Sequence, residues 1–132
     1  MSTLNGTRPL AKYEIAASSV IESGNLVALN ASGKAVPASD SASIAVIGVA
    51  DRVMDGFVEV IDGVFSFAND TADPLTRAER GKTAFVKSAS TVNKTGGTNK
   101  IPAGVVVDVY EDEVYVQVTP TALLAAAAAA AA

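Results

Sequence analysis

The sequence predicts an all-β fold, a small β-barrel or sandwich of short antiparallel strands with one short helical turn and an extended N-terminal arm. Valine-rich segments alternate apolar and polar residues at a period of two, as half-buried strands do. Turn residues separate these segments at short intervals, which is typical of barrels and sandwiches. Aromatic residues make up only 5% of the chain and Trp is absent, so the core must consist mainly of Val, Ile and Leu. β-branched side chains favour strands.

The 132 residues correspond to one domain. We expect an arm over residues 1–12, a β domain over 13–118 and a tail over 119–132. The arm is small and polar, is interrupted by Gly6 and Pro9, and is expected to be ordered only against a partner. The tail ends in eight alanines. Two interpretations of it stay open: a genuine extension that becomes helical against a partner, or placeholders for residues of unknown identity.

The first strands follow from turn residues. Residues 13–15 are expected to open the first strand. Residues 25–30 and 35–37 are expected to form a hairpin around a turn that contains Gly33. Pro37 has no N–H to donate to a ladder, so it should end this strand or lie on an edge.

The stretch 44–68 is the part around which the rest of the chain is organised. Residues 44–50 are expected to form the strand that enters it. Residues 57–60 and 64–67 alternate in hydrophobicity on either side of Asp62 and Gly63. An Asp-Gly step between alternating segments is typical of a β-hairpin, because Gly adopts positive φ without steric cost. We therefore predict a central hairpin here.

The second half of the chain contains one helical turn and a closing hairpin. Asp73 and Pro74 resemble an N-cap and a first helical residue, which predicts a turn over 75–80 that ends at Gly81. Residues 81–87 are expected to form a strand and residues 88–100 a flexible loop. Residues 101–104 re-enter the sheet. The strands 105–110 and 113–118 then form the closing hairpin, in which Val114, Val116 and Val118 face the core while Glu113, Tyr115 and Gln117 face water.

Composition excludes several kinds of chemistry. The chain has no Cys, so it has no disulfides and no thiolate ligands, and it has no His, the commonest general base and zinc ligand. Without His, a Ser-His-Asp arrangement is impossible. The formal net charge of −4 argues against a nucleic-acid partner. Neither a signal peptide nor a membrane-spanning segment is expected, so we expect no membrane partner and synthesis in a cytoplasm.

Two groups of carboxylates and one lysine are the remaining candidates for chemistry, and each is interpreted as structural. The first group is expected to lie in turns and on the outward face of a strand, and the second at the tip of a hairpin, so neither is expected to form the carboxylate pair of a hydrolase. The second group also lacks the spacing of an EF-hand. A turn accounts for the lysine, because no phosphate-binding loop surrounds it. We expect no enzyme, no catalytic residue, no cofactor and no metal site. The residues concerned are Asp51, Asp55, Glu59 and Asp62, then Asp108, Glu111, Asp112 and Glu113, and finally Lys34.

The order of these segments, from Ser23 to Val118, resembles the small capsid decoration (cement) proteins of tailed bacteriophages. No single segment is specific, and the resemblance depends on their order and spacing. It covers about three quarters of the chain and excludes both the arm and the alanine tail. The segments that carry it are Gly24-Asn25-Leu26-Val27, Ile47-Gly48-Val49-Ala50, Val58-Glu59-Val60, Asp62-Gly63-Val64-Phe65, Leu75-Thr76, Gly81-Lys82-Thr83-Ala84-Phe85-Val86, Ile101-Pro102-Ala103-Gly104-Val105 and Val114-Tyr115-Val116-Gln117-Val118.

The resemblance implies a structural virion protein, made in the host cytoplasm, that binds the outer capsid surface and stabilises it. Its expected partners are the major capsid protein and further copies of itself, as a dimer or trimer. Multivalency would then add weak contacts together. We place the expected capsid contacts at Leu4, Arg8 and Tyr13, in and next to the arm.

Two alternatives are retained. The first is a tail-associated or carbohydrate-binding β module. A sugar site usually needs an exposed aromatic ring, and Tyr115, on the predicted water-facing side of the last strand, is the one to inspect. The second and weaker alternative is a hydrolase that uses carboxylates alone.

Overall fold

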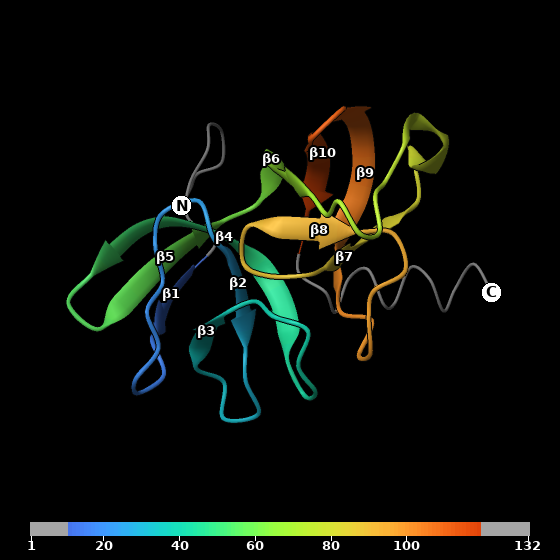
Figure 1. Cartoon of the computed structure of the whole chain (residues 1–132). Helices are drawn as coiled ribbons and strands as arrows, with labels where there is room; N and C mark the ends of the chain where they lie inside the picture. Colours follow the sequence, from blue (N-terminus) through green and yellow to red (C-terminus); the bar gives the residue numbers. More distant parts are fainter. Residues whose placement is uncertain (1–10, 120–132) are drawn as a thin grey trace, which may run out of the picture.

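The computed structural model describes residues 11–119, which form ten strands and one 3₁₀ turn (Figure 1). Five strands form an open sheet in the order β1-β5-β4-β2-β3, and five form a closed barrel in the order β10-β6-β8-β7-β9. The predicted all-β class, with a small barrel and one helical turn, is confirmed. The elements are β1 (Ala11–Glu14), β2 (Leu26–Leu29), β3 (Ala35–Pro37), β4 (Ala45–Met54), β5 (Phe57–Ile61), β6 (Gly63–Asn69), η1 (Arg77–Glu79), β7 (Thr83–Val86), β8 (Thr91–Asn93), β9 (Pro102–Tyr110) and β10 (Glu113–Val118).

The open sheet contains the first predicted hairpin. β2 and β3 pair antiparallel, and Pro37 is the last residue of β3, an edge strand, as its missing N–H requires. The two edges of the sheet approach each other, since the Ala16 N–H donates to the Ala35 carbonyl at 2.9 Å. β1 begins at Ala11, so the last two residues of the expected arm belong to this sheet.

The predicted central hairpin is wrong. β5 pairs with β4 and β1, whereas β6 pairs with β10 and β8, so the chain crosses from the open sheet to the barrel at Asp62 and Gly63. Both strands alternate in hydrophobicity because each buries one face, but they bury it in different clusters: Val60 lies in one and Phe67 in the other. The hairpin turn in this region is at Asp55 and Gly56, between β4 and β5.

The closing hairpin is confirmed. β9 and β10 pair around Glu111 and Asp112, and Val114, Val116 and Val118 are fully buried.

Two other expectations are corrected, one on the loop 88–100 and one on the direction of the strands. The loop 88–100 contains strand β8, with Val92 and Asn93 buried, because a strand of only three residues leaves almost no periodic signal.

β8 also pairs parallel to β6, so the strands are not all antiparallel. A parallel partner requires a long connection, and here that connection includes η1 and β7. The parallel pairing of β8 therefore depends on contacts that are distant in sequence, whereas its antiparallel pairing with β7 is local.

The helical turn is confirmed in place, but its N-cap is corrected. Thr76, and not Asp73, caps η1: its Oγ1 accepts a hydrogen bond from the Ala78 N–H at 3.3 Å, and the Glu79 carboxylate accepts one from the Thr76 N–H at 2.6 Å. This reciprocal pair is a capping box. Asp73 instead accepts hydrogen bonds from Thr95 N–H and Oγ1, at 2.8 and 2.6 Å, and so holds a second loop.

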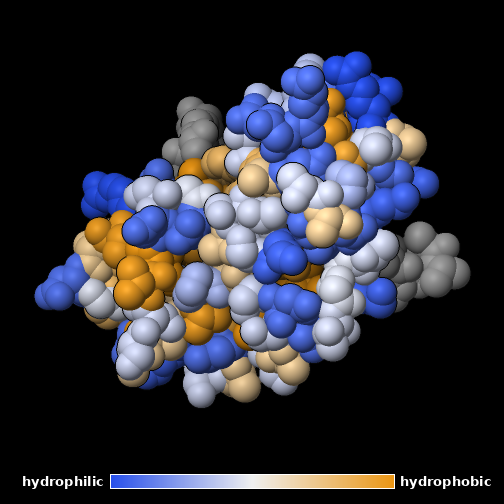
Figure 2. Space-filling model, viewed as in Figure 1, coloured by the Kyte–Doolittle hydropathy of each residue, from blue (hydrophilic) through white to orange (hydrophobic). Residues whose placement is uncertain are grey.

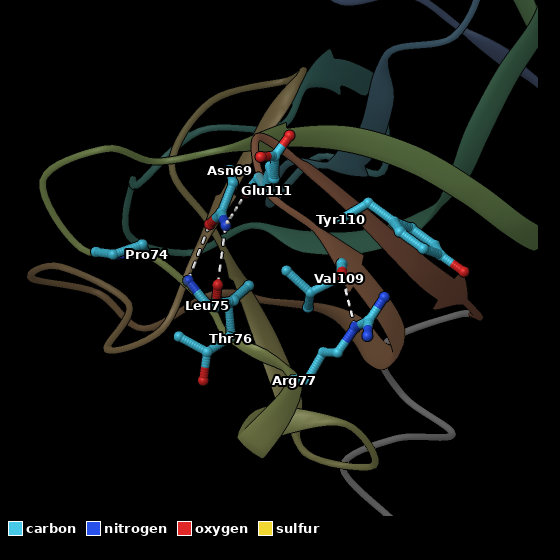
Figure 3. Close-up of a pocket in the computed structure, with 8 residues that line it drawn as sticks. All are labelled: Asn69, Pro74, Leu75, Thr76, Arg77, Val109, Tyr110 and Glu111. Atoms are coloured by element: carbon cyan, nitrogen blue, oxygen red, sulfur yellow. Dashed lines mark hydrogen bonds between the residues drawn. The ribbon is translucent and has the colours of Figure 1, made fainter.

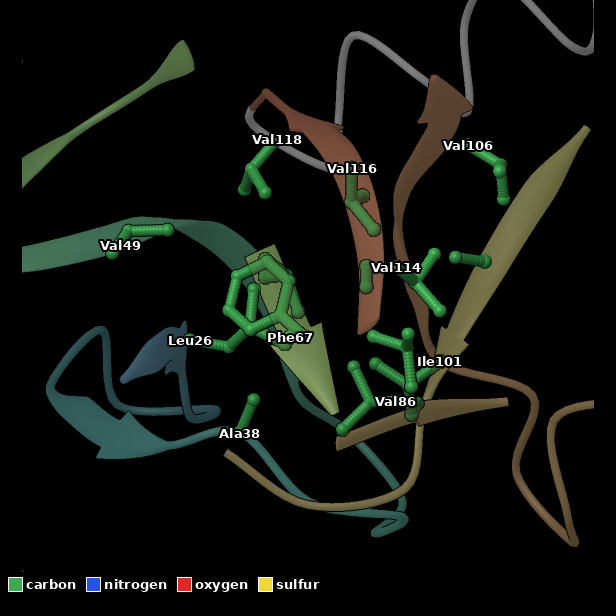
Figure 4. Packing of buried hydrophobic residues seen from close by; sticks show 14 of the residues in the cluster. Leu26, Ala38, Val49, Phe67, Val86, Ile101, Val106, Val114, Val116 and Val118 are labelled. Atoms are coloured by element: carbon green, nitrogen blue, oxygen red, sulfur yellow. The ribbon is translucent and has the colours of Figure 1, made fainter. Parts of the chain in front are cut away.

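One hydrophobic cluster joins the sheet to the barrel. Figure 4 shows Leu26 and Ala38, from the region of β2 and β3, in the same cluster as Phe67, Val114 and Val116 of the barrel. A second, smaller cluster fills the curve of the open sheet. Its buried members are Ile21, Val27, Ala35, Ala50, Val58 and Val60. The shared cluster makes the sheet and the barrel one packing unit.

A carboxylate latch connects the two halves at the surface. Asp40, after β3, accepts hydrogen bonds from the backbone N–H groups of Thr98 and Asn99 at 3.0 and 2.8 Å. These bonds, the Asn99 one first, hold the pKa of the Asp40 carboxyl below its usual range. A Cβ at Gly97 would meet the Asp40 carboxylate, so the latch also requires a glycine there.

This latch predicts a pH-dependent contribution to stability. Because the pKa of Asp40 is lower in the folded than in the unfolded chain, its contribution is present above about pH 4 and is lost as the pH falls through the folded value. We expect Asp40→Asn to lower the Tm at pH 7, and the difference from the wild type to disappear in acid. Thermal unfolding followed by circular dichroism from pH 7 to pH 2 measures this. The control is Asp51→Asn, at an exposed position. A Tm difference that does not change with pH would contradict the latch.

Candidate binding surface on the barrel

The outer face of the barrel carries large apolar side chains that are exposed. The exposed fractions of Val64, Val107 and Tyr110 are 49%, 46% and 51%. Tyr115 lies beside them, half-buried, and lines the same hollow. We call these four residues the Tyr110 patch. A cluster of this kind on the surface of a folded chain is typical of an interaction site.

Strand alternation and one bulge produce the patch. In β10 the valines point into the barrel, so Tyr115 and Gln117 point outward, and Val64 is the register partner of Gln117. The β9 register shifts: Tyr115 pairs with Asp108, but the next residue of β10 pairs with Val106. Val107 is therefore the extra residue of a β-bulge, and bulges commonly re-aim a side chain. Here the side chain points to solvent.

Two hollows flank Tyr110. The first has a volume of about 610 Å³, and the second about 520 Å³. Tyr110 lines both hollows. The first is lined by Asn69, Pro74, Leu75, Thr76, Arg77, Val109, Tyr110 and Glu111 (Figure 3). The second is lined by Val64, Val107, Asp108, Tyr110 and Tyr115.

Neighbouring side chains hold the Tyr110 ring in place. The Tyr115 ring meets it edge to face, with centroids 5.6 Å apart and planes at 85°. The Arg77 guanidinium lies over the Tyr110 ring, its Cζ 5.0 Å from the centroid. Arg77 is itself fixed, because its Nε donates to the Val109 carbonyl at 3.1 Å (Figure 3). A partner that binds here would therefore immobilise a ring that is already oriented, at a small cost in entropy.

Charges border the patch on two sides. Asp108 forms ion pairs with Arg77 at 3.5 Å and Arg80 at 3.9 Å. The pKa of Asp108 is held below its usual range, first by the hydrogen bond from the Val109 N–H, then by the Tyr110 hydroxyl and then by the two arginines. On the other side lie Glu111 and Asp112 of the β9–β10 turn and Glu113, the first residue of β10, which are exposed and form no ion pair with any residue in 11–119. We call this segment the acidic turn.

The other candidate residues for chemistry have structural surroundings. Glu59 pairs with Arg52 at 3.3 Å across β4 and β5, and Lys34 pairs with Glu14 at 3.3 Å. Asp55 lies in the β4–β5 turn. Within residues 11–119, no three His, Cys, Asp or Glu side chains come together in a way that could hold a metal ion.

The structure places only one of the three predicted contact residues. Leu4 and Arg8 lie outside the described residues. Tyr13 lies in β1, half-buried, and packs against the smaller cluster of the open sheet. Of the patch, sequence reasoning had singled out only Tyr115, from its place on the outward side of β10. Val64, Val107 and Tyr110 were not predicted, and for Val107 the reason is that the bulge that exposes it has no signal in the sequence.

A second exposed apolar group lies at the other end of the molecule. Val53 and Phe57, near the β4–β5 turn, have exposed fractions of 42% and 41%, and the Lys12 Nζ is 5.6 Å from the Phe57 ring centroid. Figure 2 shows hydrophobic side chains gathered at the left end of the molecule, where Figure 1 draws β1, β4 and β5. This group provides a matched control for the Tyr110 patch.

Comparison with known protein families, curated proteins and solved structures finds no match to this chain. Between residues 11 and 119, no helix has the length and apolar character needed to cross a membrane.

Proposed function

We propose that this protein is a structural virion protein that binds the outer surface of a phage capsid and stabilises it. The observation that carries the proposal is the Tyr110 patch, an exposed apolar surface that lines one hollow on the barrel and borders another. The resemblance of the chain from Ser23 to Val118 to capsid decoration proteins supports the same function. The proposed partner is the major capsid protein, and the proposed location is the outer capsid surface after synthesis in the host cytoplasm.

The composition of the patch favours protein binding. Tyr and Arg are the residue types most often found at the energetic centre of protein interfaces, and here Tyr110 and Arg77 are stacked. The two hollows offer space for side chains of a partner next to the exposed valines. A capsid repeats its surface many times, so a dimer or trimer of this protein would bind several sites together and gain avidity.

Removing the patch side chains tests the proposal. We expect the double substitution of Tyr110→Ser with Val107→Ser to weaken binding to assembled shells about 30-fold or more, which corresponds to about 2 kcal/mol for the loss of one hot spot. Sedimentation of purified protein with capsids, at several protein concentrations, measures this. The control is Val53→Ser with Phe57→Ser, which removes two side chains of similar exposure from the other end of the molecule. Equal binding by both double variants and the wild type would contradict the proposal.

A carbohydrate-binding or tail-associated module is the second candidate, and the Tyr110–Tyr115 pair favours it. Sugars stack on aromatic rings, and the hollow of about 520 Å³ beside this pair also contains the Asp108 carboxylate as a hydrogen-bond acceptor. Binding of the isolated protein to a glycan array, lost in Tyr110→Ser, would support this candidate. Binding to capsids but to no glycan would exclude it.

Contact of Leu4, Arg8 and Tyr13 with the shell stays a prediction. Tyr13 offers only part of its ring to a partner, because the rest packs against the smaller cluster. The number of copies in the free protein, two or three, is likewise a proposal, and sedimentation velocity without capsids measures it.

A further inference from the structure

The first part of β6 has an open edge. β6 pairs with β10 along Gly63–Ala68, but with β8 only at Ala68 and Asn69. The Ala68 N–H donates to the Ser90 carbonyl at 2.9 Å, away from β10. Backbone groups of alternate residues point the same way, so those of Val64 and Ser66 also point away from β10. No strand within residues 11–119 pairs with Val64 or Ser66 on that side.

This edge continues the one on which β1 pairs with β5. The Ile15 N–H donates to the Gly56 carbonyl at 2.9 Å, and Ala11 is the register partner of Val60. The backbone N–H and C=O groups of the even-numbered residues of β5 thus face β1. Val64 and Ser66 are also even-numbered, and they follow Val60 after four and six residues. A strand that continued β1 toward the N-terminus would therefore run along the open edge of β6.

We propose that the N-terminal arm, residues 1–10, adds to the open edge of β6 in its own chain as an antiparallel strand. Extending the β1–β5 register by residue number places Thr7 opposite Val64 and Asn5 opposite Ser66. Val64 is at most roughly 14 Å from Val60, and ten extended residues span about 33 Å, so the arm reaches the edge. Unpaired edges readily accept a strand in this way.

The residues of the arm suit this position. Pro9, which has no N–H, falls opposite Asp62, so the one ladder bond that it cannot donate lies at the crossover between β5 and β6 and not within a strand. Gly6 falls opposite the half-buried Phe65 and adds no side chain there. The arm contains Arg8 and no Asp or Glu.

The charges near Ser66 also suit the first residues of the arm. A hollow of about 360 Å³ lies next to Ser66 and Ala68, and its lining includes Asp112 and Glu113 of the acidic turn. An arm that passes Ser66 runs next to this hollow, and it carries no Asp or Glu that these carboxylates would repel. The proposal is independent of capsid binding, since it concerns the free protein.

Disulfide formation tests the register. The chain has no Cys, so Thr7→Cys with Val64→Cys introduces the only thiols. Opposite residues of an antiparallel pair have Cα atoms about 5.5 Å apart, within the range that a disulfide bridges. We expect mild oxidation to give an intramolecular bond at least 10-fold faster than in Thr7→Cys with Val53→Cys, the control at the distant β4–β5 turn. Equal rates in the two variants would overturn the proposal, and so would bonds formed only between two chains.

Amide hydrogen exchange is the second measurement. We expect the Val64 and Ser66 amides to exchange at least 10-fold more slowly in the full chain than in a chain that lacks residues 2–8. Circular dichroism verifies that the shortened chain is folded. Equal exchange in both chains would contradict docking of the arm, even if the shortened chain failed to bind capsids. Slow exchange only when capsids are present would show that a strand of the partner occupies the edge instead.

Discussion

The substitution Gly104→Ala is expected to destabilise the barrel by about 3 kcal/mol or more. Gly104 is buried in β9, where the strand packs closely against β10. A Cβ there would meet the Gln117 carbonyl oxygen and would lie 2.8 Å from Val116 Cγ1. The Gln117 carbonyl belongs to the backbone of a paired strand, so it cannot move without disturbing ladder bonds, and the Val116 methyl group is fully buried. Overpacking of this kind usually costs about 1–3 kcal/mol, and a backbone obstacle raises the cost.

Urea unfolding of the variant measures this destabilisation. The matched control is Gly56→Asn, in the β4–β5 turn. A Cβ at Gly56 meets nothing within 4 Å, and Asn tolerates its φ of +78° better than most residues. The control should change the free energy of unfolding by about 1 kcal/mol or less. If Gly104→Ala were as stable as the control, the close approach of β9 and β10 would be incorrect.

The substitution Asn69→Ala is expected to cost about 3 kcal/mol and to disorder the first hollow. The buried Asn69 side chain donates to the carbonyls of Leu75 and Glu111, at 2.9 and 3.0 Å, and accepts from the Leu75 N–H at 2.9 Å (Figure 3). It thereby ties the loop before η1 to the β9–β10 turn. Its removal leaves three backbone groups unpaired, each at about 1 kcal/mol or more when buried.

The same unfolding experiment, combined with hydrogen exchange at the Leu75 amide, tests this role. We expect exchange at Leu75 to become much faster, and binding to capsids to weaken because the loop lines the hollow beside Tyr110. Thr71→Ala, an exposed change in the same loop, is the control and should leave both quantities unchanged. Unchanged protection at Leu75 in Asn69→Ala would contradict the role assigned to this side chain.

Local features of the fold were predictable from the sequence. The β2–β3 and β9–β10 hairpins join neighbouring strands through short turns, and the alternation of Val114, Val116 and Val118 identifies the core face of β10. A turn and the two strands it joins lie next to each other in the chain, so a short window of sequence contains the whole signal.

Non-local features were not predictable. β5 and β6 each alternate like the strands of a hairpin, and only the separate clusters that bury Val60 and Phe67 show that they belong to different sheets. β8 was missed because a polar strand of three residues has no periodicity, and its parallel pairing with β6 depends on distant contacts. For the binding surface, the outward direction of Tyr115 followed from alternation, but the exposure of Val107 depends on a bulge.

Electron cryomicroscopy of capsids saturated with the protein tests the central claim most directly. We predict density for this β domain on the outer surface of the shell, with the Tyr110 patch turned toward the major capsid protein and its two hollows filled by side chains of that protein. Capsids that stay bare at saturating protein would contradict the account. Bound domains whose Tyr110 patch faces solvent would contradict it equally.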